Sequence, residues 1–219
     1  MIRRLAASIL SLSLLSSAAI AQDFAQPPAP RGAVADMADV EYMPARMHAP
    51  SRALLIRALA KRRAQNLARF HAYRTAGKFP HDFIAQTTLN VWRDPEGHLC
   101  AAATIIDKDD PALVRQVADE QNYVKLGEVQ SGALLDWIMT SGFTQVEVST
   151  IQEPFMGPRE PIRRDNSWRI AEDARLKRKY ARIEAMLRAN TDDALAQAAD
   201  RLAGNPELAW QLVGELTNS

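Results

Sequence analysis

The hydrophobic positions after Ser51 follow a helical period over most of the chain. Between Ser51 and Gly77 the apolar residues recur at spacings of three and four, and they are Ile56, Leu59, Ala60, Ala64, Leu67 and Phe70. Serine is a common helix N-cap and glycine commonly follows a helix end. The pattern therefore predicts one long helix between these two residues.

The pattern changes from helical to extended after Pro80. Residues 87–92 are rich in β-branched and large apolar side chains, and residues 99–106 are apolar again. Between them, residues 94–97 read Asp-Pro-Glu-Gly, the composition of a tight turn. We therefore predict a β-hairpin over residues 86–106. Because an isolated hairpin is marginally stable in water, we expect it to lie against helices.

Further helices are predicted along the rest of the chain. One helix is predicted to begin at Asp110-Pro111, a second to cover the apolar segment 133–139 and end before Gly142, and a third to begin with a capping box from Thr144 to Glu147. A long helix is predicted over 168–189, with one apolar stripe made of Leu176, Tyr180, Ile183 and Leu187. Two short helices are predicted to begin with caps near Thr191 and Asn205. The sequence thus predicts a mainly α fold with a small β-hairpin (α+β), its helices packed over a two-stranded antiparallel ribbon.

The first 21 residues have the three parts of an export signal. Two arginines at positions 3 and 4 precede an apolar stretch at 5–15, and Ala19-Ile20-Ala21 supplies the small residues of a cleavage site. We predict a signal peptide cleaved between Ala21 and Gln22, and hence a periplasmic or secreted protein. The apolar stretch is shorter than the roughly 20 residues of a membrane span, which argues against an N-terminal membrane anchor. No later segment is apolar for long enough to span a membrane, so we expect no transmembrane segment in the mature form.

Composition divides the remaining chain into four parts. Residues 22–50 contain five prolines and no apolar period, which predicts an extended leader. Residues 51–155 carry the predicted globular domain, residues 156–167 a proline-rich and charged loop, and residues 168–219 a C-terminal helical segment.

Four short segments in the middle of the chain form a recognisable series. They are Phe79-Pro80, Trp92 to Ala101 (aromatic-x-Asp-x-x-Gly-x-x-Cys-Ala), Gly142-Phe143-Thr144, and Ile151 to Phe155. In this series the chain resembles a loosely defined set of exported bacterial proteins of unknown function, from which it departs by His81 and by the inserted Glu153. The resemblance implies that residues 51–155 form one folding unit, and it brings no catalytic residue with it.

Charge is balanced over the whole chain but not along it. The whole chain has 27 basic and 26 acidic side chains. Removal of the signal peptide takes away two arginines and leaves 25 basic side chains against 26 acidic ones, so the net charge does not indicate a kind of partner. Residues 51–80, in contrast, contain no acidic residue. Their cations make the first long helix the best candidate for a binding surface, with Arg57, Lys61, Arg62, Arg63 and Arg69 as its contacts.

The predicted location outside the cytoplasm limits the partners that such a surface would meet. An anionic envelope component or another envelope protein fits an exported chain, whereas nucleic acid does not. An alternative is that the cations face the protein's own acidic segments, such as 107–120 and the C-terminal helices.

The one cysteine, Cys100, raises the possibility of thiol chemistry. A thiolate nucleophile needs a nearby base or cation, which His98, His81 or His71 would provide if the fold brought them together. Unpaired cysteine is more often buried as a small apolar group, and three alanines follow Cys100 as in a closely packed segment.

No cofactor or metal motif is present in the sequence. The four histidines match no established ligand spacing, and His81-Asp82 comes nearest to one. The sequence also lacks a phosphate-binding glycine loop and a nucleophile elbow. We therefore expect no cofactor and no metal. The favoured reading is a non-enzymatic binding or scaffold protein of the cell envelope that uses the basic helix, and the alternative is a thiol-dependent enzyme using Cys100 with a histidine.

Overall fold

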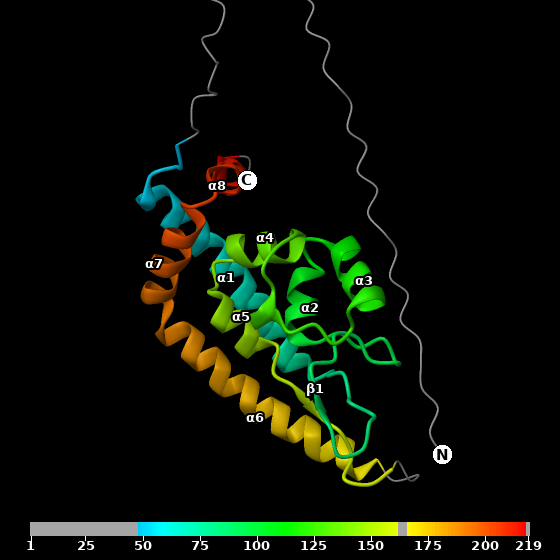
Figure 1. The fold of residues 1–219 in the computed structure, drawn as a ribbon. Coiled ribbons are helices and arrows are strands. Elements are labelled where there is room, and N and C mark those ends of the chain that lie inside the picture. Colours follow the sequence, from blue (N-terminus) through cyan, green and yellow to red (C-terminus); the bar gives the residue numbers. More distant parts are fainter. Residues whose placement is uncertain (1–47, 162–165, 218–219) are drawn as a thin grey trace, which may run out of the picture. The chain divides into compact units, whose positions relative to one another are not determined.

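A computed structural model describes residues 48–161 and 166–217 of this chain (Figure 1). The predicted signal peptide and residues 22–47 of the predicted leader lie outside these ranges. The described residues belong to one compact unit. Within the described residues, no helix combines the length and the apolar character that crossing a membrane requires.

The described residues are mainly helical, with one small antiparallel sheet, which confirms the predicted fold class. In chain order the elements are α1 (Arg52–Ala76), β1 (Thr88–Leu89), α2 (Ala101–Ile106), α3 (Pro111–Glu120), the 3-10 turn η1 (Leu126–Glu128), α4 (Ala133–Thr140), α5 (Gln145–Ile151), β2 (Phe155–Met156), α6 (Ser167–Ala189), α7 (Thr191–Leu202) and α8 (Pro206–Thr217).

The hairpin predicted over residues 86–106 is wrong in its second half. Residues 101–106 form α2, and β1 pairs instead with β2, from which residues 90–154 separate it, with Leu89 opposite Phe155. Short buried apolar runs do not distinguish a strand from a helix, and Ala101 to Ala103 are the strongest helix formers. The turn itself is confirmed, because the Gly97 N–H donates to the Asp94 carbonyl and a single bridge joins Arg93 to Leu99.

Helix α1 passes through both parts of the hydrophobic core. Its first half packs with α7 and α8, and its second half packs with α2 and α6. The C-terminal helices therefore share a core with the elements of 51–155 (Figure 1). The buried stripe of α1 runs through Arg63 and Asn66, whereas Ala64 of the predicted stripe is exposed.

Local signals place the later helices as predicted, but the predicted cap at Thr191 is wrong. The N-cap of α7 is Asn190, and the Thr191 hydroxyl donates back to the Leu187 and Arg188 carbonyls. Thr144 and Glu147 form a complete capping box at the start of α5, and Asp110 caps α3 through the Leu113 N–H. All four apolar residues of the predicted α6 stripe are buried. The predicted loop at 156–167 begins inside β2, since Met156 pairs with Thr88.

Candidate functional site

Cys100 lies inside the core and is fully buried. Its sulfur accepts the Ala103 N–H at 3.4 Å and so caps α2, and the described residues offer the sulfur no imidazole partner. Burial raises the pKa of the Cys100 thiol from 9.0 to about 12, because the apolar surroundings disfavour the thiolate. The expectation of burial is confirmed, and this geometry does not favour a thiol nucleophile.

The outer cations of α1 face the protein's own carboxylates. Asp109 bonds Arg69 at 2.8 Å and Arg62 at 3.3 Å, and Arg62 also pairs with Glu215. Burial opposes ionisation of Asp109, but hydrogen bonds from Arg69 and Trp137 outweigh it and hold its pKa below the ordinary value. Partners therefore come from the acidic segment 107–120 and from the C-terminal helices, as the alternative reading of these charges expected.

Arg63 is a structural residue and no part of the surface. It is 1% exposed and forms a two-pronged ion pair with Glu147, at 2.7 and 2.9 Å. Its remaining N–H groups donate to the carbonyls of Gly142 and Leu187 and to the Thr191 hydroxyl. One guanidinium thus joins α1, α5, α6 and α7.

Gly142 permits this close approach of the α4–α5 turn to α1. Its φ is +78°, and a side-chain carbon at this position would lie 2.3 Å from the Leu59 carbonyl oxygen. Of the five predicted surface contacts, only Arg57 and Lys61 have no ion-pair partner among the described residues.

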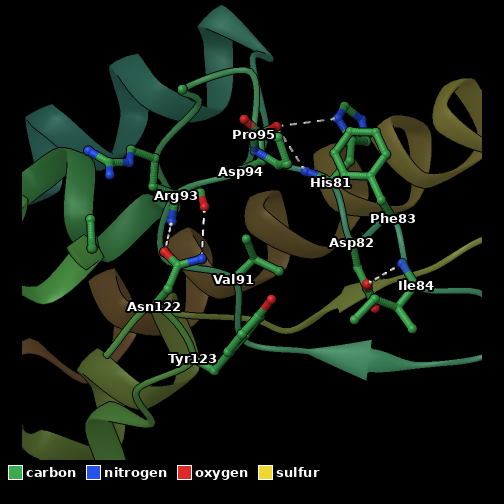
Figure 2. Close-up of a pocket in the computed structure, with 12 residues that line it drawn as sticks. His81, Asp82, Phe83, Ile84, Val91, Arg93, Asp94, Pro95, Asn122 and Tyr123 are labelled. Carbon is green, nitrogen blue, oxygen red and sulfur yellow. Dashed lines mark hydrogen bonds and ion pairs between the residues drawn. The ribbon is translucent and has the colours of Figure 1, made fainter. Parts of the chain in front are cut away.

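The described residues enclose a hollow of about 680 Å³ between the segment 81–84 and the end of α3 (Figure 2). Asn122 fixes one wall, because its side-chain amide accepts the Arg93 N–H and donates to the Arg93 carbonyl. The rim is apolar and partly exposed, with Ile84 at 51% and Tyr123 at 55% exposure.

Asp94 forms the polar floor of this hollow. Its carboxylate is fully buried and accepts the N–H groups of Glu96 and His98 at 2.9 and 2.8 Å. It also accepts the His81 N–H at 3.2 Å, which ties the segment 81–84 to the turn. The Asp94 side chain is therefore held by three main-chain donors, and the His98 ring lies within hydrogen-bond distance of it.

His81 lies beside Asp94 with its side chain 9% exposed. Its Nε2 is 3.1 Å from Asp173 Oδ1, and its Nδ1 is 4.0 Å from Asp94 Oδ2 (Figure 2). The rings of Phe83 and Trp168 pack edge-on around the imidazole. His81 is thus held between two carboxylates in a largely apolar cage.

The other histidines take different positions. His98 Nδ1 lies 3.1 Å from Asp94 Oδ2 and 3.8 Å from Glu96 Oε2, so His98 joins the same cluster. His71 pairs with Glu184 on the outer face of α1. The structure therefore brings His81 and His98 together through Asp94, and it brings neither of them to Cys100.

Asp94, Glu96 and Asp173 were not predicted as site residues. The alternation of Asp94, Glu96 and His98 in one turn could have indicated that these side chains lie close together. Asp173 lies 92 residues from His81, and no local pattern connects the two residues. Comparisons with protein-family models, with curated proteins and with solved structures found no match for this chain.

Proposed function

We propose that this protein is an exported, non-catalytic binding protein that holds a small organic ligand in the hollow between the segment 81–84 and Tyr123. The observation that carries the proposal is the lining of the hollow, which joins an apolar, partly exposed rim to a buried polar floor. Small-ligand sites are concave, mostly apolar and carry a few fixed polar groups. Export rests on the sequence pattern of residues 1–21.

The rim indicates the kind of ligand. Phe83, Ile84, Val91 and Tyr123 offer apolar and aromatic surface. Arg93 also lines the hollow, and its guanidinium pairs with Asp119 at 2.8 Å, so an anionic group of the ligand would share this cation with Asp119. A flat apolar body with one anionic group fits this combination, because aromatic rings pack against such bodies and guanidinium binds anions. This site replaces the basic helix as the main binding surface that we propose.

The fluorescent probe 1-anilinonaphthalene-8-sulfonate has this chemistry and tests the proposal. We expect saturable binding at one site, and we expect Ile84→Ser to weaken it by about 1 kcal/mol, roughly fivefold in Kd, because apolar contact is lost. Ile170→Ser is the matched control, since Ile170 is 72% exposed and lies outside the hollow. Equal loss in both variants, or unsaturable binding, would contradict the proposal.

A second candidate is weak binding to an anionic envelope surface through Arg57 and Lys61. These two cations are exposed, stand one turn apart on α1 and have no ion-pair partner among the described residues. We expect the double variant Arg57→Gln/Lys61→Gln to lose about 1 kcal/mol per charge in binding to vesicles with anionic lipid at low salt. Arg52→Gln is the control, because Asp200 already pairs with Arg52. Unchanged vesicle binding in the double variant would remove this candidate.

A further inference from the structure

The imidazole of His81 faces the Asp94 carboxylate, but its Nδ1 makes no hydrogen bond with that carboxylate. When its Nε2–H donates to Asp173, its Nδ1 carries a lone pair, and Nδ1 is buried with no hydrogen-bond partner among the described residues. The nearest polar atom in that direction is Asp94 Oδ2, 4.0 Å away, which is also an acceptor. Two acceptors that face each other across this distance leave room for a cation that both would bind.

Two more side chains lie close to the Asp94 carboxylate. His98 Nδ1 lies 3.1 Å from Asp94 Oδ2 and 3.8 Å from Glu96 Oε2, and one ligand atom from each of these three residues lies within 4.8 Å of the others. The turn creates this convergence, because residues 94, 96 and 98 alternate around Gly97, whose φ is +88°.

We propose that His81, Asp94, Glu96 and His98 form a site for a divalent transition-metal ion. Ligands 2.0–2.1 Å from a tetrahedral Zn²⁺ stand about 3.3 Å apart. Three separations approach this value: 3.1 Å from His98 Nδ1 to Asp94 Oδ2, 3.8 Å from His98 Nδ1 to Glu96 Oε2, and 4.0 Å from His81 Nδ1 to Asp94 Oδ2. The His81 ring must turn toward His98 and Glu96 to complete the set, because only the other three ligand atoms already lie within 4.8 Å of one another. The ligand atoms are His81 Nδ1, His98 Nδ1, Asp94 Oδ2 and Glu96 Oε2. The site contradicts the expectation, drawn from the sequence, that the chain holds no metal.

Asp173 supplies the outer support that such a site needs. Metal-bound histidines usually donate their second ring N–H to a carboxylate, which fixes the tautomer and the ring orientation. Asp173 stands 3.1 Å from His81 Nε2 and is in that position. Arg169 holds Glu96 from the other side through an ion pair with its Oε1, leaving Oε2 toward His98.

The donor set selects the kind of metal. Two imidazoles with two carboxylates suit Zn²⁺ and its neighbours, whereas Ca²⁺ and Mg²⁺ take oxygen ligands in larger or more hydrated sites. The metal would stand in the wall of the hollow, since His81, Asp94 and Gly97 also line it. The inference does not depend on the proposed organic ligand, because the metal ligands belong to the chain itself.

Zn²⁺ titration of the mature chain tests the site. The protein is purified after export by the expressing cell, and a chelator removes any bound metal before the titration. We expect one Zn²⁺ per chain by calorimetry, bound about 10- to 100-fold more weakly in Asp173→Asn, because outer partners contribute this much to metal affinity. His98→Gln should lose at least as much, and His98 is exposed enough for the fold to survive the change.

The matched control is His71→Gln, the same substitution on α1 beside Glu184. We expect it to leave both stoichiometry and affinity unchanged. If the wild-type chain takes up no Zn²⁺ at micromolar concentrations, the cluster is a hydrogen-bonded group that binds no metal and the proposal is wrong. Equal losses in His98→Gln and His71→Gln would show adventitious surface binding and would also overturn it. Probe binding by the hollow is measured separately with the metal-free protein, so the two proposals fail independently.

Discussion

We expect Arg63→Met to lower the free energy of unfolding by about 3–5 kcal/mol, since it leaves Glu147 buried without its cation. Both side chains of the pair are at least nine-tenths buried, at 1% and 8% exposure. The change also removes the donors to the Gly142 and Leu187 carbonyls. Urea unfolding followed by circular dichroism measures the loss.

Arg62→Met is the matched control one residue earlier. Arg62 is partly exposed and pairs with Asp109 and Glu215 at the surface, so its loss should cost less than about 1 kcal/mol. The double variant Arg63→Met/Glu147→Leu should recover part of the stability, because it removes the uncompensated carboxylate as well. Similar losses for Arg62→Met and Arg63→Met would show that the buried pair does not hold these helices together.

Alkylation of Cys100 should be about a thousandfold slower in the folded chain than that of a free thiol at neutral pH. A thiol pKa of about 12 in place of 9.0 reduces the thiolate population by that factor, and burial further blocks access of the reagent. Iodoacetamide labelling followed by mass spectrometry measures the rate.

The same chain unfolded in guanidinium chloride provides the reference rate for that thiol. Ala64→Cys adds a control thiol at an exposed position of α1, and it should react quickly in the folded protein. Rapid labelling of Cys100 in the native chain would mean that the sulfur is accessible, and a thiol-dependent enzyme would again become the better reading.

Local sequence signals predicted the elements whose ends are fixed by neighbouring residues. Ser51 and Gly77 bound α1, and Thr144 with Glu147 starts α5, because caps act over three or four residues. The second strand of the hairpin was predicted wrongly because strand pairing is not limited to neighbouring residues. Phe155, which pairs with Leu89, stands far along the chain, and no local pattern identifies a distant strand partner.

The basic helix shows how charge along a sequence misleads about a surface. The spacing rule that placed Leu59 and Leu67 on the buried face also allows Arg63 there, but a buried arginine is predictable only when its distant partner Glu147 is known. The candidate metal site likewise combines residues that are neighbours in the sequence with residues that are not. Asp94 and His98 are near neighbours in one turn, whereas His81 and Asp173 join them only through the tertiary fold.

We propose that this protein binds its metal where His81 and His98 meet Asp94, and not at Cys100 or on α1. Long-range proton–nitrogen NMR spectra of the four histidine side chains during Zn²⁺ addition test it most directly. We predict that the Nδ1 signals of His81 and His98 shift together and saturate at one equivalent, while those of His48 and His71 stay in place. A first shift at His48 or His71, or no shift at His81, would contradict the account.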